Sequence, residues 1–176
     1  MSNVIIGIIG VILFIGLAVA GAVILGSDFM TASASTQAAT VTAHMHQMAT
    51  GVQVLKARRG VTIPSNVGAG LGNVLVANKA LEEVPVNPVV AGSGYVASNP
   101  LGGSDGSETR LIYTDMGDSK KARDACFAIE EQAGNPNPAG VVDSPTAFDT
   151  RAVQAPRVGC MMDVYISNHY VAYIPV

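Results

Sequence analysis

The chain has 176 residues, a formal net charge of −3 and no tryptophan. Its basic residues are scattered along the sequence, so it lacks the basic face typical of nucleic-acid-binding proteins, and we expect no nucleic-acid partner. One membrane-length helix would leave about 120 residues, enough for a single modest domain. The scarcity of aromatic residues favours an exported domain with long loops over a dense catalytic core.

Residues 4–26 form an apolar run, VIIGIIGVILFIGLAVAGAVILG, that contains no charged side chain. As a helix this run would be roughly 35 Å long, enough to cross the hydrocarbon core of a bilayer. A cleaved secretory signal would have a basic start and a shorter apolar core, whereas the first basic residue here is Lys56. We therefore expect a retained transmembrane helix, with cleavage near Ala18, Ala20 or Ala22 as the alternative.

Small residues recur in this run at spacings that place them close together on a helix. Ala18, Ala22 and Gly26 are four residues apart, as are Gly16 and Ala20. Small side chains let helix backbones approach closely, so we expect these positions to pack against the same helix in other copies of the chain.

The helix is expected to continue over residues 27–59 as an amphipathic segment. Its larger apolar residues alternate between spacings of four and three, which places them on one stripe of a helix. This stripe consists of Val41, Met45, Met48, Val52 and Leu55. Arg58 and Arg59 suit the negative end of the helix dipole, and Gly60 is a predicted left-handed terminator. We expect one helix of roughly 85 Å whose second half docks on a globular domain over residues 60–176.

Residues 61–109 are rich in glycine and proline and are predicted to be mostly loops, with a short helix near Asn73 to Glu83. The segment GAGLG at 68–72 lacks the GxGxxG spacing of a dinucleotide-binding turn and is interpreted as a flexible loop.

The C-terminal third has clear helix and strand signals. RLIYTDM at 110–116 is a predicted strand, and Asp118 or Ser119 can cap a following helix over 120–133. VGCMMDVYI then alternates, with Cys160, Met162, Val164 and Ile166 expected on one face. Asn168 and His169 are predicted to turn the chain into a last strand, YVAYI. The expected fold is α+β, with the long helix on one face of a small antiparallel sheet.

The chain contains two cysteines, Cys126 and Cys160, and neither belongs to a CxxC pair or a Cys/His cluster. This spacing is poor for zinc, and an even cysteine count beside a membrane anchor favours a disulfide in an exported domain. A disulfide between them would close the loop from Cys126 to Cys160 and stabilise the fold by about 3 to 4 kcal/mol. Two unrelated buried thiols are the alternative.

Other polar residues give no catalytic or metal-binding prediction, and no cofactor is expected. His44 and His46 lie about 200° apart around a helix, so they cannot easily share a metal ion. The carboxylates Asp115, Asp118, Asp124, Glu130 and Glu131 are best explained as a solvated helix face.

The order of these elements resembles the type IV pilins, and within them the type IVb branch of toxin-coregulated, bundle-forming and conjugative thin pili. The resemblance spans nearly the whole chain. It is carried by the apolar start at Met1, VQVLKARRG followed by IPSN, DACFAI, VGCMMD and the terminal NHYVAYI. One position departs from the family, because Ile5 stands where type IV pilins usually have a glutamate. A pilin precursor would begin with a short leader ending in glycine, so under this resemblance Met1 is expected to be the mature N-terminus.

The resemblance implies a non-enzymatic structural protein, the repeating subunit of an extracellular filament. Its implied partners are identical subunits, the bacterial inner membrane before assembly, and the pilus assembly machinery. Met1, Ile5 and the small residues of the apolar run would then contact other subunits in the filament core. A membrane-anchored minor pilin or tip adhesin and a membrane-anchored enzyme are the alternatives.

Overall fold

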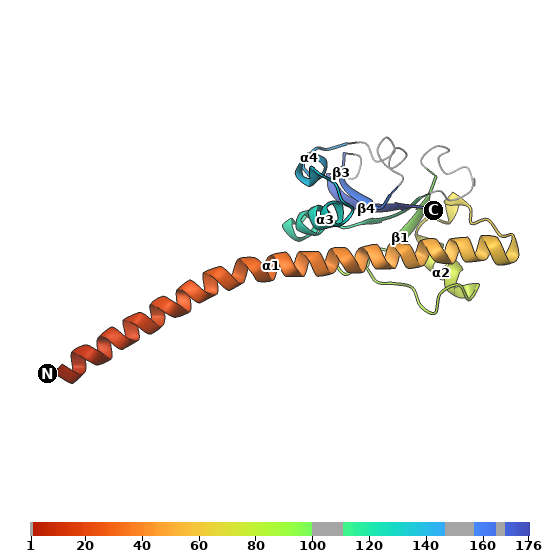
Figure 1. The fold of residues 1–176 in the computed structure, drawn as a ribbon. Helices are drawn as coiled ribbons and strands as arrows, with labels where there is room; N and C mark the ends of the chain where they lie inside the picture. The colour runs from red at the N-terminus through yellow and green to blue at the C-terminus, as the bar shows by residue number, and fades with distance from the viewer. Residues whose placement is uncertain (1, 100–110, 147–156, 165–167) are drawn as a thin grey trace. The chain divides into compact units, whose positions relative to one another are not determined.

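The computed structural model describes residues 2–99, 111–146, 157–164 and 168–176, with the side chains at 2–7, 22–28 and 65–66 outside that description. By its contacts the chain divides into two compact units, Met1–Ser33 and Ala34–Val176. The first helix, α1, runs from Ser2 to Arg59 and contributes to both units (Figure 1). The expected continuous helix is therefore present.

The second unit contains the rest of the secondary structure (Figure 1). In chain order, the elements after α1 are η1 (Ser65–Gly70), α2 (Leu71–Ala77), β1 (Tyr95–Ser98), β2 (Leu111–Asp115), α3 (Lys120–Gln132), α4 (Pro138–Val142), β3 (Gly159–Asp163) and β4 (His169–Pro175). The strands form one antiparallel sheet in the order β1-β2-β4-β3. The predicted α+β class, with a long helix packed on an antiparallel sheet, is confirmed.

Both faces of the sheet are buried. On one face, Ile112, Ala172 and Ile174 belong to the same apolar cluster as the buried residues of α1 and α3. On the other face, Leu111 and Met161 belong to a second, smaller cluster with Val171 and Tyr173. Successive residues of a strand point to opposite faces of the sheet, so neighbouring residues fall into different clusters. This explains why β4 is apolar at every position from Tyr170 to Ile174.

Two helix ends follow their local sequence signals. Gly60 has φ +62° and its N–H donates to the Lys56 carbonyl at 3.0 Å, so it ends α1 as the sequence predicts. At the start of α3, the Ser119 hydroxyl accepts a hydrogen bond from the Ala122 N–H at 3.1 Å. This is the N-cap arrangement, so Ser119 and not Asp118 caps the helix.

The outer side of β3 is engaged along much of its length. The Cys160 N–H donates to the Glu130 carboxylate, and Thr146 both donates to the Met162 carbonyl and accepts from the Val164 N–H. In an antiparallel strand these alternate residues direct their backbone groups away from the partner strand. The strand β3 is therefore paired with β4 on one side and hydrogen-bonded at these alternate residues on the other.

The predicted helix at 73–83 is wrong in its position. The glycine-rich segment before it is already coiled into η1, and α2 ends at Ala77 because Lys79 adopts φ +57°. The GAGLG segment is thus part of η1 and α2, not a flexible loop. A Cβ at Gly72 would lie 2.5 Å from Val84 Cγ1, so glycine is what allows α2 to pack closely on that side chain.

Three further differences from the sequence prediction concern short elements. Strand β1 and helix α4 fall in segments expected to be loops, although the Asn137 side chain and Pro138 at the start of α4 are helix-start signals. Strand β3 ends at Asp163, and Val164 is exposed, so the alternating face is shorter than expected. Ile166 lies outside the described residues.

Candidate functional site

Residues 8–20 of the first unit are all apolar. Every residue from 8 to 20 is exposed. Phe14 and Leu17 expose 74% and 73% of their surface. Monomeric soluble proteins rarely expose large contiguous apolar surface, and a helix that is apolar all round is normally buried. This segment is therefore the strongest candidate for an interaction surface.

The residues expected to pack between subunits are only partly described. Gly16, Ala18 and Ala20 are exposed, and a Cβ added at Gly16 would meet no atom within 4 Å. Ile5, Ala22 and Gly26 lie in α1, but their side chains are outside the described set, as is Met1 entirely. Packing of these residues against other copies stays a prediction.

No helix in the described part of the chain combines the length and the apolar character that crossing a membrane requires. The side chains at 4–7 and 22–26 lie outside that description, so the transmembrane span over residues 4–26 stays a prediction.

The amphipathic half of α1 buries its predicted stripe. Val41, Met45, Met48, Val52 and Leu55 are all buried. They belong to one cluster with Ile112 of β2, Ala172 of β4 and Ile129 of α3. The stripe therefore forms the helix side of the main core of the second unit.

A polar contact joins α1 to β1 beside this stripe. His44 Nδ1 lies 3.1 Å from the Tyr95 hydroxyl, and the two rings meet edge to face. Burial raises the pKa of Tyr95, so its hydroxyl stays protonated and polar within the core. His46, the other histidine of the sequence pair, is exposed. His44 is thus a structural partner of Tyr95.

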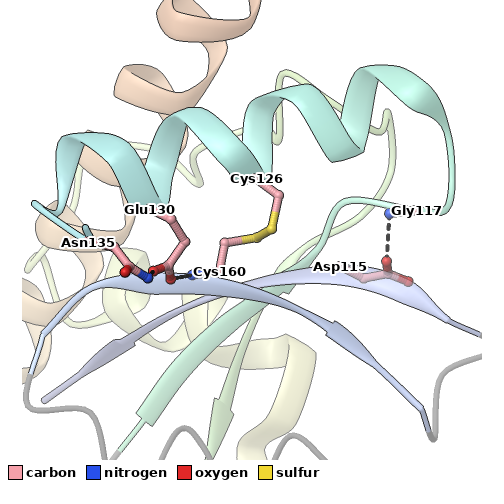
Figure 2. Close-up of a disulfide and its surroundings, with 6 residues drawn as sticks. All are labelled: Asp115, Gly117, Cys126, Glu130, Asn135 and Cys160. Atoms are coloured by element: carbon pink, nitrogen blue, oxygen red, sulfur yellow. Dashed lines mark hydrogen bonds between the residues drawn. A yellow bond between two sulfur atoms is a disulfide. The ribbon is translucent and has the colours of Figure 1, made fainter. Parts of the chain in front are cut away.

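The predicted disulfide is confirmed. Cys126 of α3 and Cys160 of β3 are bonded, with their Cα atoms 5.3 Å apart, and both are fully buried. Figure 2 shows the bridge between α3 and the sheet. The alternative of two free thiols is excluded.

The interpretation of the acidic residues as one solvated helix face is wrong for two of them. Glu130 is only 3% exposed and accepts the Cys160 N–H at 2.6 Å. Asp115 lies on β2, where its carboxylate accepts the Gly117 N–H at 2.7 Å and lies 2.9 Å from His169 Nδ1. Their partners are distant in sequence or in a tight turn, so the charge pattern alone could not reveal them. Among the described residues, no three His, Cys, Asp or Glu side chains group as metal ligands.

Removing the ion pair between α3 and α4 should have a small, pH-dependent effect. Arg123 bonds Asp143 through two nitrogens at 2.8 Å, and these hydrogen bonds lower the pKa of Asp143. A lowered pKa in the folded state gives stability that is present above the unfolded pKa and lost as the pH falls through the folded pKa. Both side chains are more than 40% exposed, so Arg123→Ala should lower the free energy of unfolding at pH 7 by less than about 1 kcal/mol.

Urea unfolding of both proteins at several pH values checks this expectation. The difference between wild type and Arg123→Ala should vanish once Asp143 is protonated. A difference that persists undiminished in acid would show that Arg123 acts through packing of its methylene groups instead.

In comparisons with known proteins, no family model, no curated protein and no solved structure matches this chain.

Proposed function

We propose that this chain is the repeating structural subunit of an extracellular filament similar to a type IVb pilus. The observation that carries the proposal is the exposed apolar surface of residues 8–20. Only an apolar environment on every side can satisfy such a helix. A bundle of the same helix from other copies supplies that environment in a filament, and lipid supplies it before assembly.

The proposed mechanism is a change of solvent. A pool of subunits is held in the bacterial inner membrane by the apolar run at 4–26, and each subunit moves its apolar helix from lipid into the filament core. Lipid solvates apolar side chains about as well as other helices do, so burial alone gives little driving force. Assembly machinery must therefore supply the work of extraction. The role proposed for the chain itself is structural and not catalytic.

The second unit supports this role through its own stability. Its disulfide and the buried stripe of α1 hold the sheet and α3 on the amphipathic half of the helix. A subunit exposed outside the cell benefits from such a covalent bond, because a disulfide persists in an oxidising environment. The same features would suit a minor pilin or a tip adhesin.

Substitutions in the apolar helix test whether it packs against other copies. Ala18 is exposed, so Ala18→Leu has room within its own subunit and keeps the segment apolar. It should leave membrane insertion intact and abolish or weaken filaments, because bulk at a close helix contact causes overpacking. Val11→Leu is the matched control, since it changes one large apolar side chain for another and should leave filaments unchanged.

Cryo-electron microscopy of sheared surface filaments is the measurement. The expected result is a filament composed of many copies of this chain with residues 8–20 in contact at its centre. Normal filaments from Ala18→Leu cells would contradict close packing at that position. A chain found in only a few copies at a filament tip, or only as a monomer in the membrane, would overturn the proposal.

A further inference from the structure

A buried carboxylate lies directly beside the disulfide. Glu130 is one helical turn after Cys126 in α3, and its Oε1 accepts the backbone N–H of Cys160 at 2.6 Å. Its Oε2 accepts the Asn135 side-chain amide at 2.6 Å. Figure 2 shows the carboxylate between Asn135 and the start of β3. The residue that follows the first cysteine by one turn thus holds the backbone of the second cysteine.

The end of α3 is shaped to bring Asn135 to this position. Gly134 has φ +76° and donates to the Glu131 carbonyl, while the Asn135 N–H donates to the Glu130 carbonyl. This pair of bonds is the Schellman motif. It folds the chain back over the last turn, so Asn135 and Glu130 are fixed relative to each other by the helix end.

The strand leaves room for the carboxylate. A Cβ added at Gly159 would lie 2.8 Å from Glu130 Oε1 and 2.6 Å from the Tyr173 hydroxyl. Any larger residue at the start of β3 would therefore displace the Glu130 side chain or Tyr173. Glycine immediately before Cys160 is a requirement of this contact.

Stability alone is a poor explanation for Glu130. A buried carboxylate loses its hydration, and a negative charge near a helix C-terminus is opposed by the helix dipole. What the contact provides is geometry. The Asn135 amide holds the Glu130 carboxylate, and the carboxylate in turn fixes the position of the Cys160 backbone relative to α3. A neutral apolar side chain would fill the space without fixing that position.

We propose that Glu130 is a positioning residue for oxidation of the cysteines. By holding the Cys160 backbone, it sets the two thiols of the reduced chain opposite each other before the bond forms. Oxidation then proceeds by exchange with a small disulfide of the glutathione class. One cysteine thiolate attacks that disulfide and releases one thiol, and the other cysteine thiolate attacks the mixed disulfide and releases the second. The oxidant gains two electrons, and the two cysteine protons pass to solvent or the released thiolates.

The equilibrium constant for forming the Cys126–Cys160 bond with glutathione measures this positioning. It is determined for the full chain in detergent, in native buffer and again in concentrated urea, where positioning is lost. Glu130→Gln should lower the constant in native buffer by about tenfold, the scale of one hydrogen bond to a charged group, and leave the value in urea unchanged. Asn135→Ala keeps the carboxylate and removes one donor to it, so a roughly threefold fall is expected.

Asn87→Ala is the control for general destabilisation. Asn87 is buried, and its side chain bonds Thr114, Asp115, Val89 and Val90, none of which belongs to α3 or β3. For each variant, the fall in the equilibrium constant in native buffer is compared with the loss of unfolding free energy. If Asn87→Ala and Glu130→Gln show the same fall for the same loss, Glu130 acts only on stability and the proposal is overturned. If Glu130→Gln does not fold, Asn135→Ala decides by the same comparison. An unchanged native constant in a folded Glu130→Gln protein would also overturn it.

Discussion

Replacing Val52 with aspartate should lower the free energy of unfolding of the second unit by roughly 3 to 5 kcal/mol. Val52 is 6% exposed and lies in the main apolar cluster, so an ionised carboxylate there would lose most of its hydration among apolar side chains. Small domains are stable by only about 5 to 15 kcal/mol, so such a loss is a large part of the total. Urea denaturation of the detergent-solubilised chain, followed by circular dichroism, measures it.

Gln53→Asp is the matched control for this substitution. Gln53 is the next residue of α1 and is exposed, so the same charge enters the same helix on its solvent side. It should change the unfolding free energy by less than about 0.5 kcal/mol. Equal effects of the two substitutions would show that the amphipathic half of α1 does not dock through the Val52 side.

Removing the disulfide should have an effect of similar size. The bond joins residues 34 apart, and replacing both cysteines by alanine should lower the free energy of unfolding by about 3 to 4 kcal/mol in the chain-entropy model. The cross-link acts mainly on the unfolded chain, which gains freedom when the bond is absent. Comparing the unfolding curves of wild type and the double variant measures the difference.

Alkylation provides the accompanying chemical test. Because both cysteines are fully buried and joined in a disulfide, a thiol reagent should label neither of them in the native protein. Labelling at Cys126 and Cys160 should require both unfolding and a reductant. Two reactive thiols in the untreated native protein would contradict the bond.

Features with local signals were predicted well from the sequence. The stripe from Val41 to Leu55 follows the helical period, Gly60 is a terminator by its own conformational freedom, and Ser119 caps α3 through a bond to a residue three positions away. The disulfide was predicted from an even count of cysteines beside an expected membrane anchor. Each of these depends on a few neighbouring residues or on composition, which a sequence shows directly.

Features that depend on distant partners were missed. Glu130 belongs to a charged stretch of sequence, and nothing near it indicates that its partner is the backbone of Cys160, 30 residues later. Strand β1 is short and lies between glycines and an asparagine, and its pairing with β2 is what gives it strand structure. Contacts at the candidate assembly surface are harder still to predict from the sequence, because they depend on a second molecule.

The bonded outer side of β3 has a consequence for how copies of this chain can meet. An exposed edge strand is a template on which another chain can add a strand, as happens in donor-strand complexes and amyloid. At Cys160, Met162 and Val164 that template is already occupied by Glu130 and Thr146. An incoming strand would first have to break these bonds, so this edge resists sheet-to-sheet aggregation. Association of copies by addition of a strand at β3 is thereby disfavoured.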